Sequence, residues 1–290
     1  MRNTVQYIKE KENQVLLNKI YVEEHVKNAL KEDISFEDIT TDNLTTENDK
    51  MKCCLNSRED GIFCGKDVFK TVFELLSDDI NINFYVNDGD EIKKGQKLAD
   101  IEGSARAILT AERTALNYVQ RMSGIATDSR KFQNIISEYG VRMVDTRKTT
   151  PNFRIFEKYA VKIGSGFVHR YNLSDCAMIK DNHVKFAGSI TNAVKKLKEK
   201  ISHAHKIEVE CDTLEQVKEA LEVGADIIML DNMPIEVMKE GVKLINHRAV
   251  VEASGNVNID TLRDIASTGV DIISSSAIVA KAPTLDLGLD

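Results

Sequence analysis

Short apolar runs alternate with helical segments throughout the part of the chain that follows Gly140, and this alternation constrains the fold more than any other feature. The apolar runs are 143–144, 177–179, 207–209, 227–230, 250–251 and 272–273. Segments with helical spacing lie between them, at 189–200, 213–222, 236–244 and 260–267. Strands that alternate with helices predict a parallel sheet. No Gly-rich dinucleotide-binding motif is present, which favours a barrel, and six strands instead of eight predict an incomplete α/β barrel.

Capping residues mark the ends of two of these helices. Thr213, with Gln216 three residues later, and Asp260 stand where N-caps are expected. Gly224 and Gly269 follow the same helices, where C-terminal caps are expected. The two helices should therefore begin near residues 213 and 260 and end just before the glycines.

The first part of the chain has a different character. Residues 1–20 are charged and predict a helical extension, and 21–30 predict a further helix. Over 51–102, apolar runs alternate with turn signals such as Asp88-Gly89 and Lys94-Gly95, which indicates a small β-rich domain with one helix at 67–76. Apolar spacing over 105–138 predicts two connecting helices, broken near Ser123-Gly124.

Charged and small residues stand at the carboxyl end of every predicted barrel strand. The active site of an α/β barrel lies at these ends, so the residues should converge on one mouth. They are Arg147, Lys148, Lys180, Glu210, Asp231, Ser254, Gly255 and 274–276. A solvated loop position would explain any one of them, but the set as a whole indicates a site.

The residue types in this set suit an anionic, phosphorylated ligand. Clustered cations bind carboxylates or phosphates. Glu210 and Asp231 offer the oxygen ligands that Mg²⁺ prefers. The loops at 254–255 and 274–277 precede helices, where backbone N–H groups can cradle a phosphate. His169 could be structural, but its neighbour Arg170 favours a ligand contact.

Bulk composition excludes several classes of protein. The net charge of −7 argues against nucleic-acid or membrane-surface binding through overall charge. No apolar run approaches the roughly 18 residues of a membrane-spanning helix, and the N-terminus lacks the apolar core of a signal peptide. The five cysteines form no C-x-x-C pair, which is typical of reduced thiols. We therefore expect a cytoplasmic protein that binds neither nucleic acid nor membrane.

Several blocks of residues resemble the signature motifs of the quinolinate phosphoribosyltransferase family. Those in the C-terminal part are 145–151, His169-Arg170, 179–183, 207–210, 230–233 and 253–255. Those elsewhere are 29–33, 38–41, 112–117 and 282–286. The similarity runs in order over roughly residues 20 to 290, which makes a chance match implausible.

The resemblance implies a type II phosphoribosyltransferase fold. A smaller α/β sandwich domain would comprise residues 21–115 with about 280–290, and an incomplete barrel of about six strands would comprise 116–279. It also implies a homodimer, or a higher assembly such as a hexamer, in which the sandwich domain of one subunit closes the barrel of the other. Arg113, which spacing alone would place on a helix surface, would then reach a substrate carboxylate across the interface.

The implied reaction joins quinolinate to phosphoribosyl pyrophosphate with Mg²⁺ as cofactor, and releases pyrophosphate and CO₂ to give nicotinate mononucleotide for NAD biosynthesis. Lys148, Lys180, Glu210 and Asp231 are the expected catalytic residues, and Glu210 and Asp231 would hold the metal directly or through water. The expected substrate-binding residues are Arg113, Arg147, Lys148, Thr149, His169, Arg170, Lys180, Glu210, Asp231, Ser254, Gly255, Asn256, Ser275, Ser276 and Ala277.

The sequence departs from the family pattern in three places. Ser165 replaces the middle glycine of a Gly-Gly-Gly run, Val168 replaces an asparagine before His169, and Ser275-Ser276 replaces Val-Gly. These departures leave two alternatives open. One is a related phosphoribosyltransferase of the molybdenum-operon type that uses another acceptor, and the other is a non-catalytic structural paralogue.

Overall fold

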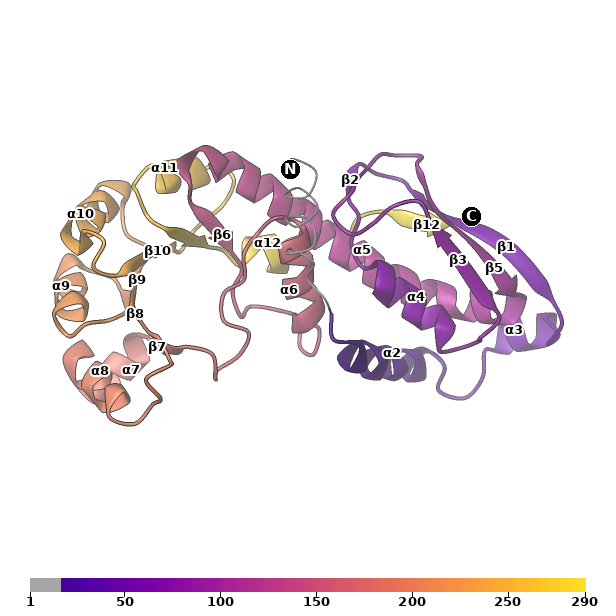
Figure 1. Cartoon of the computed structure of the whole chain (residues 1–290), viewed down its shortest axis with the longest axis horizontal. Helices are drawn as coiled ribbons and strands as arrows, with labels where there is room; N and C mark the ends of the chain where they lie inside the picture. The colour runs from indigo at the N-terminus through magenta and orange to yellow at the C-terminus, as the bar shows by residue number, and fades with distance from the viewer. Residues whose placement is uncertain (1–16) are drawn as a thin grey trace, which may run out of the picture. The chain divides into compact units, whose positions relative to one another are not determined.

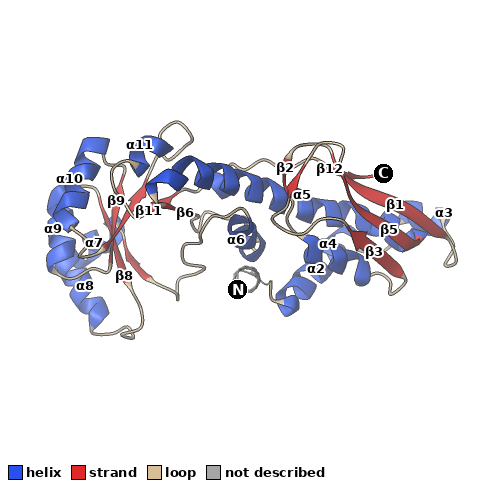
Figure 2. Cartoon of the chain, turned by 45° about the horizontal axis from the view of Figure 1, so that its top comes forward, coloured by secondary structure: helices blue, strands red, loops and turns tan. Residues whose placement is uncertain are grey.

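The structure is a computed structural model that describes residues 17–290. Most of the helical extension expected over 1–20 lies outside these residues. The chain forms two compact units, shown in Figures 1 and 2. The first contains the described residues up to Thr127 together with Ile155–Gly164 and Pro283–Asp290, and the second contains Asp128–Arg154 and Ser165–Ala282. Within residues 17–290, no helix combines the length and apolar character needed to cross a membrane.

The first unit is built on a four-stranded antiparallel sheet in the order β12-β1-β5-β3. Its strands are β1 (Lys50–Ser57), β3 (Ile80–Phe84), β5 (Lys97–Ser104) and β12 (Leu287–Leu289), and β2 (Gly61–Ile62) pairs separately with β4 (Glu91–Ile92). Helix α2 (Lys19–Asp33) packs against α4 (Lys66–Glu74), which contacts β3, and α3 (Ile39–Leu44) follows α2. The last residues of the chain join this unit because Leu289 pairs with Leu55.

Turns form at both predicted positions and connect β3 to β4 and β4 to β5, but neither closes a β-hairpin because β4 pairs with β2. Gly89 and Gly95 have φ angles of 95° and 82°, a region that favours glycine. The N–H of Asp90 donates to the carbonyl of Asn87, and that of Gln96 donates to Lys93. The turn chemistry that the sequence indicates is therefore confirmed.

A single helix, α5 (Ala105–Ile136), replaces the two helices predicted over this stretch. The break expected at Ser123-Gly124 is wrong because both residues serve packing. The hydroxyl of Ser123 accepts the N–H of Cys64 at 3.0 Å and donates to its carbonyl at 3.2 Å. A Cβ on Gly124 would lie 1.8 Å from the carbonyl oxygen of Pro283, so glycine permits a close approach of the C-terminal segment.

The boundary between the two units lies within the unbroken helix α5. The first unit extends to Thr127 on α5, whereas the sequence placed the boundary after residue 115. It also takes in most of α6 (Arg154–Ile163), where Glu157 pairs with Arg121 of α5 at 2.8 Å. A short 3-10 helix, η1 (Ser137–Tyr139), follows α5.

The second unit is a six-stranded parallel sheet in the order β6-β11-β10-β9-β8-β7. Its strands are β6 (Arg142–Val144), β7 (Ala177–Ile179), β8 (Ile207–Cys211), β9 (Ile227–Asp231), β10 (Val250–Ser254) and β11 (Ile272–Ser274). β6 and β7 are the two edge strands of the sheet and do not pair with each other, so the barrel is open between them. All six predicted strands are present, so the incomplete barrel with a smaller α/β unit is confirmed.

Helices cover the outer side of this arc of strands, as Figure 1 shows for α8, α9 and α10. The helices are α7 (Asp181–Ala187), α8 (Ile190–Lys198), α9 (Leu214–Glu222), α10 (Ile235–Ile245), α11 (Leu262–Ala266) and α12 (Ala277–Ala280). Thr213 and Gln216 form the predicted capping box at α9. The residue before α11 is Thr261, however, so the N-cap expected at Asp260 is wrong by one position.

Candidate active site

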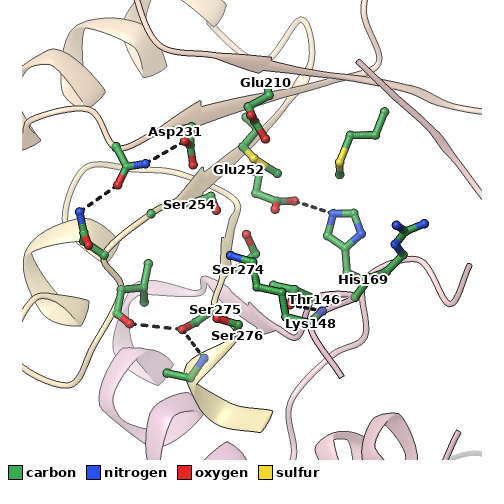
Figure 3. A pocket seen from close by; sticks show the side chains of 18 of the residues that line it. Thr146, Lys148, His169, Glu210, Asp231, Glu252, Ser254, Ser274, Ser275 and Ser276 are labelled. Carbon is green, nitrogen blue, oxygen red and sulfur yellow. Dashed lines mark hydrogen bonds and ion pairs between the residues drawn. The ribbon is translucent and has the colours of Figure 1, made fainter. Parts of the chain in front are cut away.

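A cavity of about 730 Å³ is lined by the carboxyl ends of the barrel strands and the loops that follow them. Figure 3 shows side chains from several strands pointing into it. The lining residues are Thr146, Arg147, Lys148, His169, Arg170, Met178, Lys180, Glu210, Met229, Asp231, Asn232, Glu252, Ser254, Gly255, Asn256, Val257, Ser274, Ser275, Ser276, Ala277 and Lys281. All of them belong to the second unit.

The cavity brings together every predicted site residue except Arg113 and Thr149. Arg113 is exposed on α5 in the first unit. The hydroxyl of Thr149 accepts a hydrogen bond from Nε of Arg154 at 2.9 Å, so it braces the loop after β6. Lys281, which sequence analysis did not select, adds another cation to the lining.

Lys180 and Glu210 form an ion pair across neighbouring strands β7 and β8. The turn that presents Lys180 is fixed by His183, whose Nδ1 accepts the backbone N–H of Lys180 at 3.0 Å. The N–H of His183 donates in return to the carbonyl of Lys180 at 2.8 Å. His183, which belongs to the motif at 179–183, thus stabilises the turn at the start of α7.

Two asparagine amides hold Asp231 at the end of β9. Nδ2 of Asn232 donates to Oδ2 of Asp231 at 2.8 Å, and Nδ2 of Asn256 donates to Oδ1 of Asn232 at 2.9 Å. Gly255 lets the two loops approach, because a Cβ there would lie 2.3 Å from Oδ1 of Asn232. Its φ of +91° is also a conformation that side chains disfavour.

Ser275 connects the loop after β11 to the rest of the cavity wall. Its hydroxyl donates to the carbonyl of Val257 at 3.2 Å and accepts the N–H of Ala277 at 3.1 Å. The serine that departs from the family pattern here is thus engaged within the protein. Ser276, the next residue, lines the cavity directly before α12.

The cations of this site crowd one another. Burial lowers the pKa of Arg147, and the positive charges of Arg170 and Arg154 lower it further. The guanidinium remains charged, and the smaller contributions from Arg170 and Arg154 show that other positive charges lie close to it. An anionic ligand relieves such repulsion, which makes this part of the cavity suited to carboxylates or phosphates.

His169 contacts two buried glutamates that sequence analysis did not select. Its Nε2 lies 3.3 Å from an oxygen of Glu208 and 3.3 Å from an oxygen of Glu252, whose side chains are 0% and 1% exposed. Both glutamates precede a selected residue by two positions, since Glu210 and Ser254 follow them on the same strands. Period two in a strand places such pairs on one face, and this signal could have identified them.

The proton on His169 is governed by these neighbours. Burial lowers its pKa, but the carboxylates of Glu208 and Glu252 outweigh this effect and raise the pKa to about 10. The backbone N–H of Arg170 acts against a second ring proton, because it donates to Nδ1 at 2.8 Å. The neutral ring that donates to the glutamates and the imidazolium both carry a proton on Nε2, between the two carboxylates, whereas the Arg170 contact favours the neutral ring without a proton on Nδ1.

Two sets of residues have donor atoms suited to a cation. Glu210 and Asp231 offer hard oxygen atoms to the cavity, as Mg²⁺ requires. Within residues 17–290, the group formed by His169, Glu208 and Glu252 is the one set of at least three such side chains whose ligand atoms all lie within 4.8 Å of one another. A metal on Nε2 would need the ring proton on Nδ1, where the N–H of Arg170 points.

Comparisons with known proteins cover both units. Residues 38–123 match the N-terminal domain of quinolinate phosphoribosyl transferase, and 125–290 match its C-terminal domain. A probable nicotinate-nucleotide pyrophosphorylase [carboxylating] from Synechocystis sp. is 40% identical over 273 residues, which cover 93% of this chain and 92% of the relative. One from Bacillus subtilis is 37% identical, with 94% of each chain covered.

Solved structures show the same relation. NadC from Streptococcus pyogenes has a TM-score of 0.92 and 36% identity, covering 96% of this chain and 98% of its own. The nicotinate-nucleotide pyrophosphorylase from Francisella tularensis has a TM-score of 0.90 and 37% identity, covering 95% and 97%. Taken with the two domain matches, these similarities over nearly the whole length show that the chain belongs to the quinolinate phosphoribosyltransferase family.

Proposed function

We propose that this protein transfers the phosphoribosyl group of phosphoribosyl pyrophosphate to quinolinate, with decarboxylation, to give nicotinate mononucleotide, pyrophosphate and CO₂. The observation that carries the proposal is the composition of the cavity. Five cations line it together with the carboxylates of Glu210 and Asp231, namely Arg147, Lys148, Arg170, Lys180 and Lys281. Quinolinate has two adjacent carboxylates and the other substrate has several phosphates, so both need clustered cations.

Positioning and electrostatics dominate the proposed mechanism. The cations hold the quinolinate carboxylates and orient the ring nitrogen toward the anomeric carbon of the ribose. As pyrophosphate leaves, positive charge develops on the ribose, and the carboxylates of Glu210 and Asp231 stabilise it. Lys180, paired with Glu210 before substrate binds, is placed to exchange this partner for a phosphate or carboxylate.

Magnesium fits the oxygen donors of Glu210 and Asp231 and would neutralise charge on the departing pyrophosphate. Loss of the 2-carboxylate requires no general base from the protein. Once the ring nitrogen carries the ribose, the cationic ring accepts the electron pair of the broken carbon–carbon bond. The residues of the cavity then need to hold the ring and its remaining carboxylate.

A homodimer is part of the proposal, with Arg113 of one subunit serving the cavity of the other. The first unit carries exposed apolar side chains suited to an interface, including Phe36, Ile39 and Leu44, which are 96%, 70% and 77% exposed. Mixing an Arg113→Ala subunit with a Lys180→Ala subunit tests this arrangement. Each variant alone should be inactive, whereas mixed dimers should recover part of the activity because one of their two cavities is intact.

We further propose a cytoplasmic location, in keeping with five free cysteines.

The substitutions Arg147→Ala and Lys180→Ala test the site directly. Each should lower turnover of quinolinate by at least a hundredfold while the circular dichroism spectrum stays unchanged. Full activity in both variants would contradict the assigned site. If wild-type protein binds phosphoribosyl pyrophosphate but gives no product from quinolinate, another acceptor is indicated, and Val168→Asn is the first change to make.

A further inference from the structure

Two carboxylates that the proposed mechanism does not use lie against His169. Glu208 is the second residue of β8 and Glu252 the third of β10, and both side chains are almost fully buried. Each has an oxygen 3.3 Å from Nε2 of His169, and Figure 3 shows the ring of His169 directed at Glu252. Burying two carboxylates is costly, and it indicates a task that apolar side chains could not perform.

Two further polar atoms of His169 are also held by the protein. Its backbone N–H donates to Oδ1 of the buried Asp145 at 2.8 Å. Its Nδ1 accepts the backbone N–H of Arg170, also at 2.8 Å. Both ring nitrogens therefore face protein groups, so the ring is fixed in one orientation with a proton on Nε2, between the two carboxylates.

Arg170 is the residue that this fixed ring supports. Its backbone is tied to the ring through Nδ1, and its Nη1 donates to the carbonyl of Cys176 at 2.7 Å. Its Nη2 lies 3.6 Å from the sulfur of Met178, another residue of the cavity wall. A guanidinium has five N–H donors, and these contacts leave donors to bind an anion in the cavity.

We propose that Glu208 and Glu252 are positioning residues for the acceptor: they hold His169, and through it they set Arg170 to bind a carboxylate of the substrate. This inference rests on the proposed function and assigns the His169–Arg170 side of the cavity to quinolinate. It predicts that loss of either buried carboxylate weakens quinolinate binding selectively. Phosphoribosyl pyrophosphate, held by other residues of the cavity, should bind as before.

The experiment compares Glu252→Gln and Glu208→Gln with wild type, measuring KM for each substrate separately. Loss of a hydrogen bond to a charged group costs about 10–100-fold in binding, so KM for quinolinate should rise by that factor while KM for phosphoribosyl pyrophosphate changes less than about twofold. Asp271→Asn is the matched control. Its carboxylate accepts the N–H of Val251 at 2.8 Å, next to Glu252 on β10, and it should leave both values unchanged.

A second measurement is independent of turnover and needs no glutamate variant to fold. The ¹⁵N spectrum of wild-type protein at neutral pH, with His169 assigned by His169→Gln, should show a ring proton on Nε2, which a neutral ring that donates to the glutamates and an imidazolium both carry. Three results would overturn the inference: the opposite tautomer, equal changes in both KM values, or a stoichiometric divalent cation that Glu252→Gln loses. Absence of any wild-type turnover with quinolinate would instead refute the proposed function. The protonation of the His169 ring would still test whether Glu208 and Glu252 hold that ring.

Discussion

The substitution Gly255→Ala tests how the carboxylate of Asp231 is held. The new Cβ would lie 2.3 Å from Oδ1 and 2.4 Å from Cγ of Asn232, so the amide of Asn232 must move. That movement breaks its bonds with Asp231 and Asn256, each worth about 0.5–1.5 kcal/mol. The φ of +91° adds about 1–2 kcal/mol of backbone strain for a residue with a side chain. The free energy of unfolding should therefore fall by about 2–5 kcal/mol.

Gly140→Ala is the matched control for this prediction. Gly140 lies in the same unit with φ of +68°, but its Cβ would meet no atom within 4 Å. Strain alone, partly offset by the reduced entropy of the unfolded chain, should cost about 1 kcal/mol. Urea denaturation gives both values, and KM for phosphoribosyl pyrophosphate should rise at least tenfold in Gly255→Ala alone. Equal stability losses, or an unchanged KM in Gly255→Ala, would refute the reasoning.

Three further substitutions test other parts of the structure. Ser165→Gly should raise the free energy of unfolding by about 0.5–1 kcal/mol without changing turnover, because the exposed Ser165 has a φ of +70°, which strains a residue with a side chain. A loss of stability would show that this backbone strain is absent. Arg121→Met should lower the free energy of unfolding by about 3 kcal/mol in denaturant melts, since it removes a cation 2.8 Å from the fully buried Glu157. An unchanged free energy of unfolding would show that the ion pair contributes little. Burial raises the pKa of Asp226, but its bonds from Lys206 and Ile207 outweigh this and hold the pKa below its usual value. The stability gained is therefore present above about pH 4 and lost as pH falls further. Asp226→Asn should cost about 1 kcal/mol at pH 7 and progressively less below about pH 4, and a difference independent of pH would contradict this.

Features that depend on neighbours in sequence could be predicted. The six strands of the second unit were predicted because each apolar run ends at a polar residue and is followed by a helical pattern. Thr213 and Gln216 identified the start of α9 for the same reason, since a capping box is local chemistry. The cavity residues at strand ends followed from the fold class itself.

Features that depend on distant partners could not be predicted in the same way. Ser123-Gly124 has the composition of a helix break, and only the contacts with Cys64 and Pro283 show that it is a packing site within α5. Period two could have placed Glu208 and Glu252 on the cavity face of their strands, but their contact with His169, which is distant from both in sequence, could not be predicted. Thr261, and not Asp260, precedes α11 because the side chain of Asn258 accepts the backbone N–H groups of both residues and sets the conformation of the loop.

The measurement that tests the central claim most directly is the product stoichiometry of purified protein with Mg²⁺, phosphoribosyl pyrophosphate and quinolinate labelled in its 2-carboxylate. Nicotinate, which lacks that carboxylate, serves as the parallel acceptor. The account predicts one labelled CO₂ and one pyrophosphate for each nicotinate mononucleotide formed from quinolinate, and no product from nicotinate. Product from nicotinate alone, or no product from a folded protein that binds phosphoribosyl pyrophosphate, would contradict it.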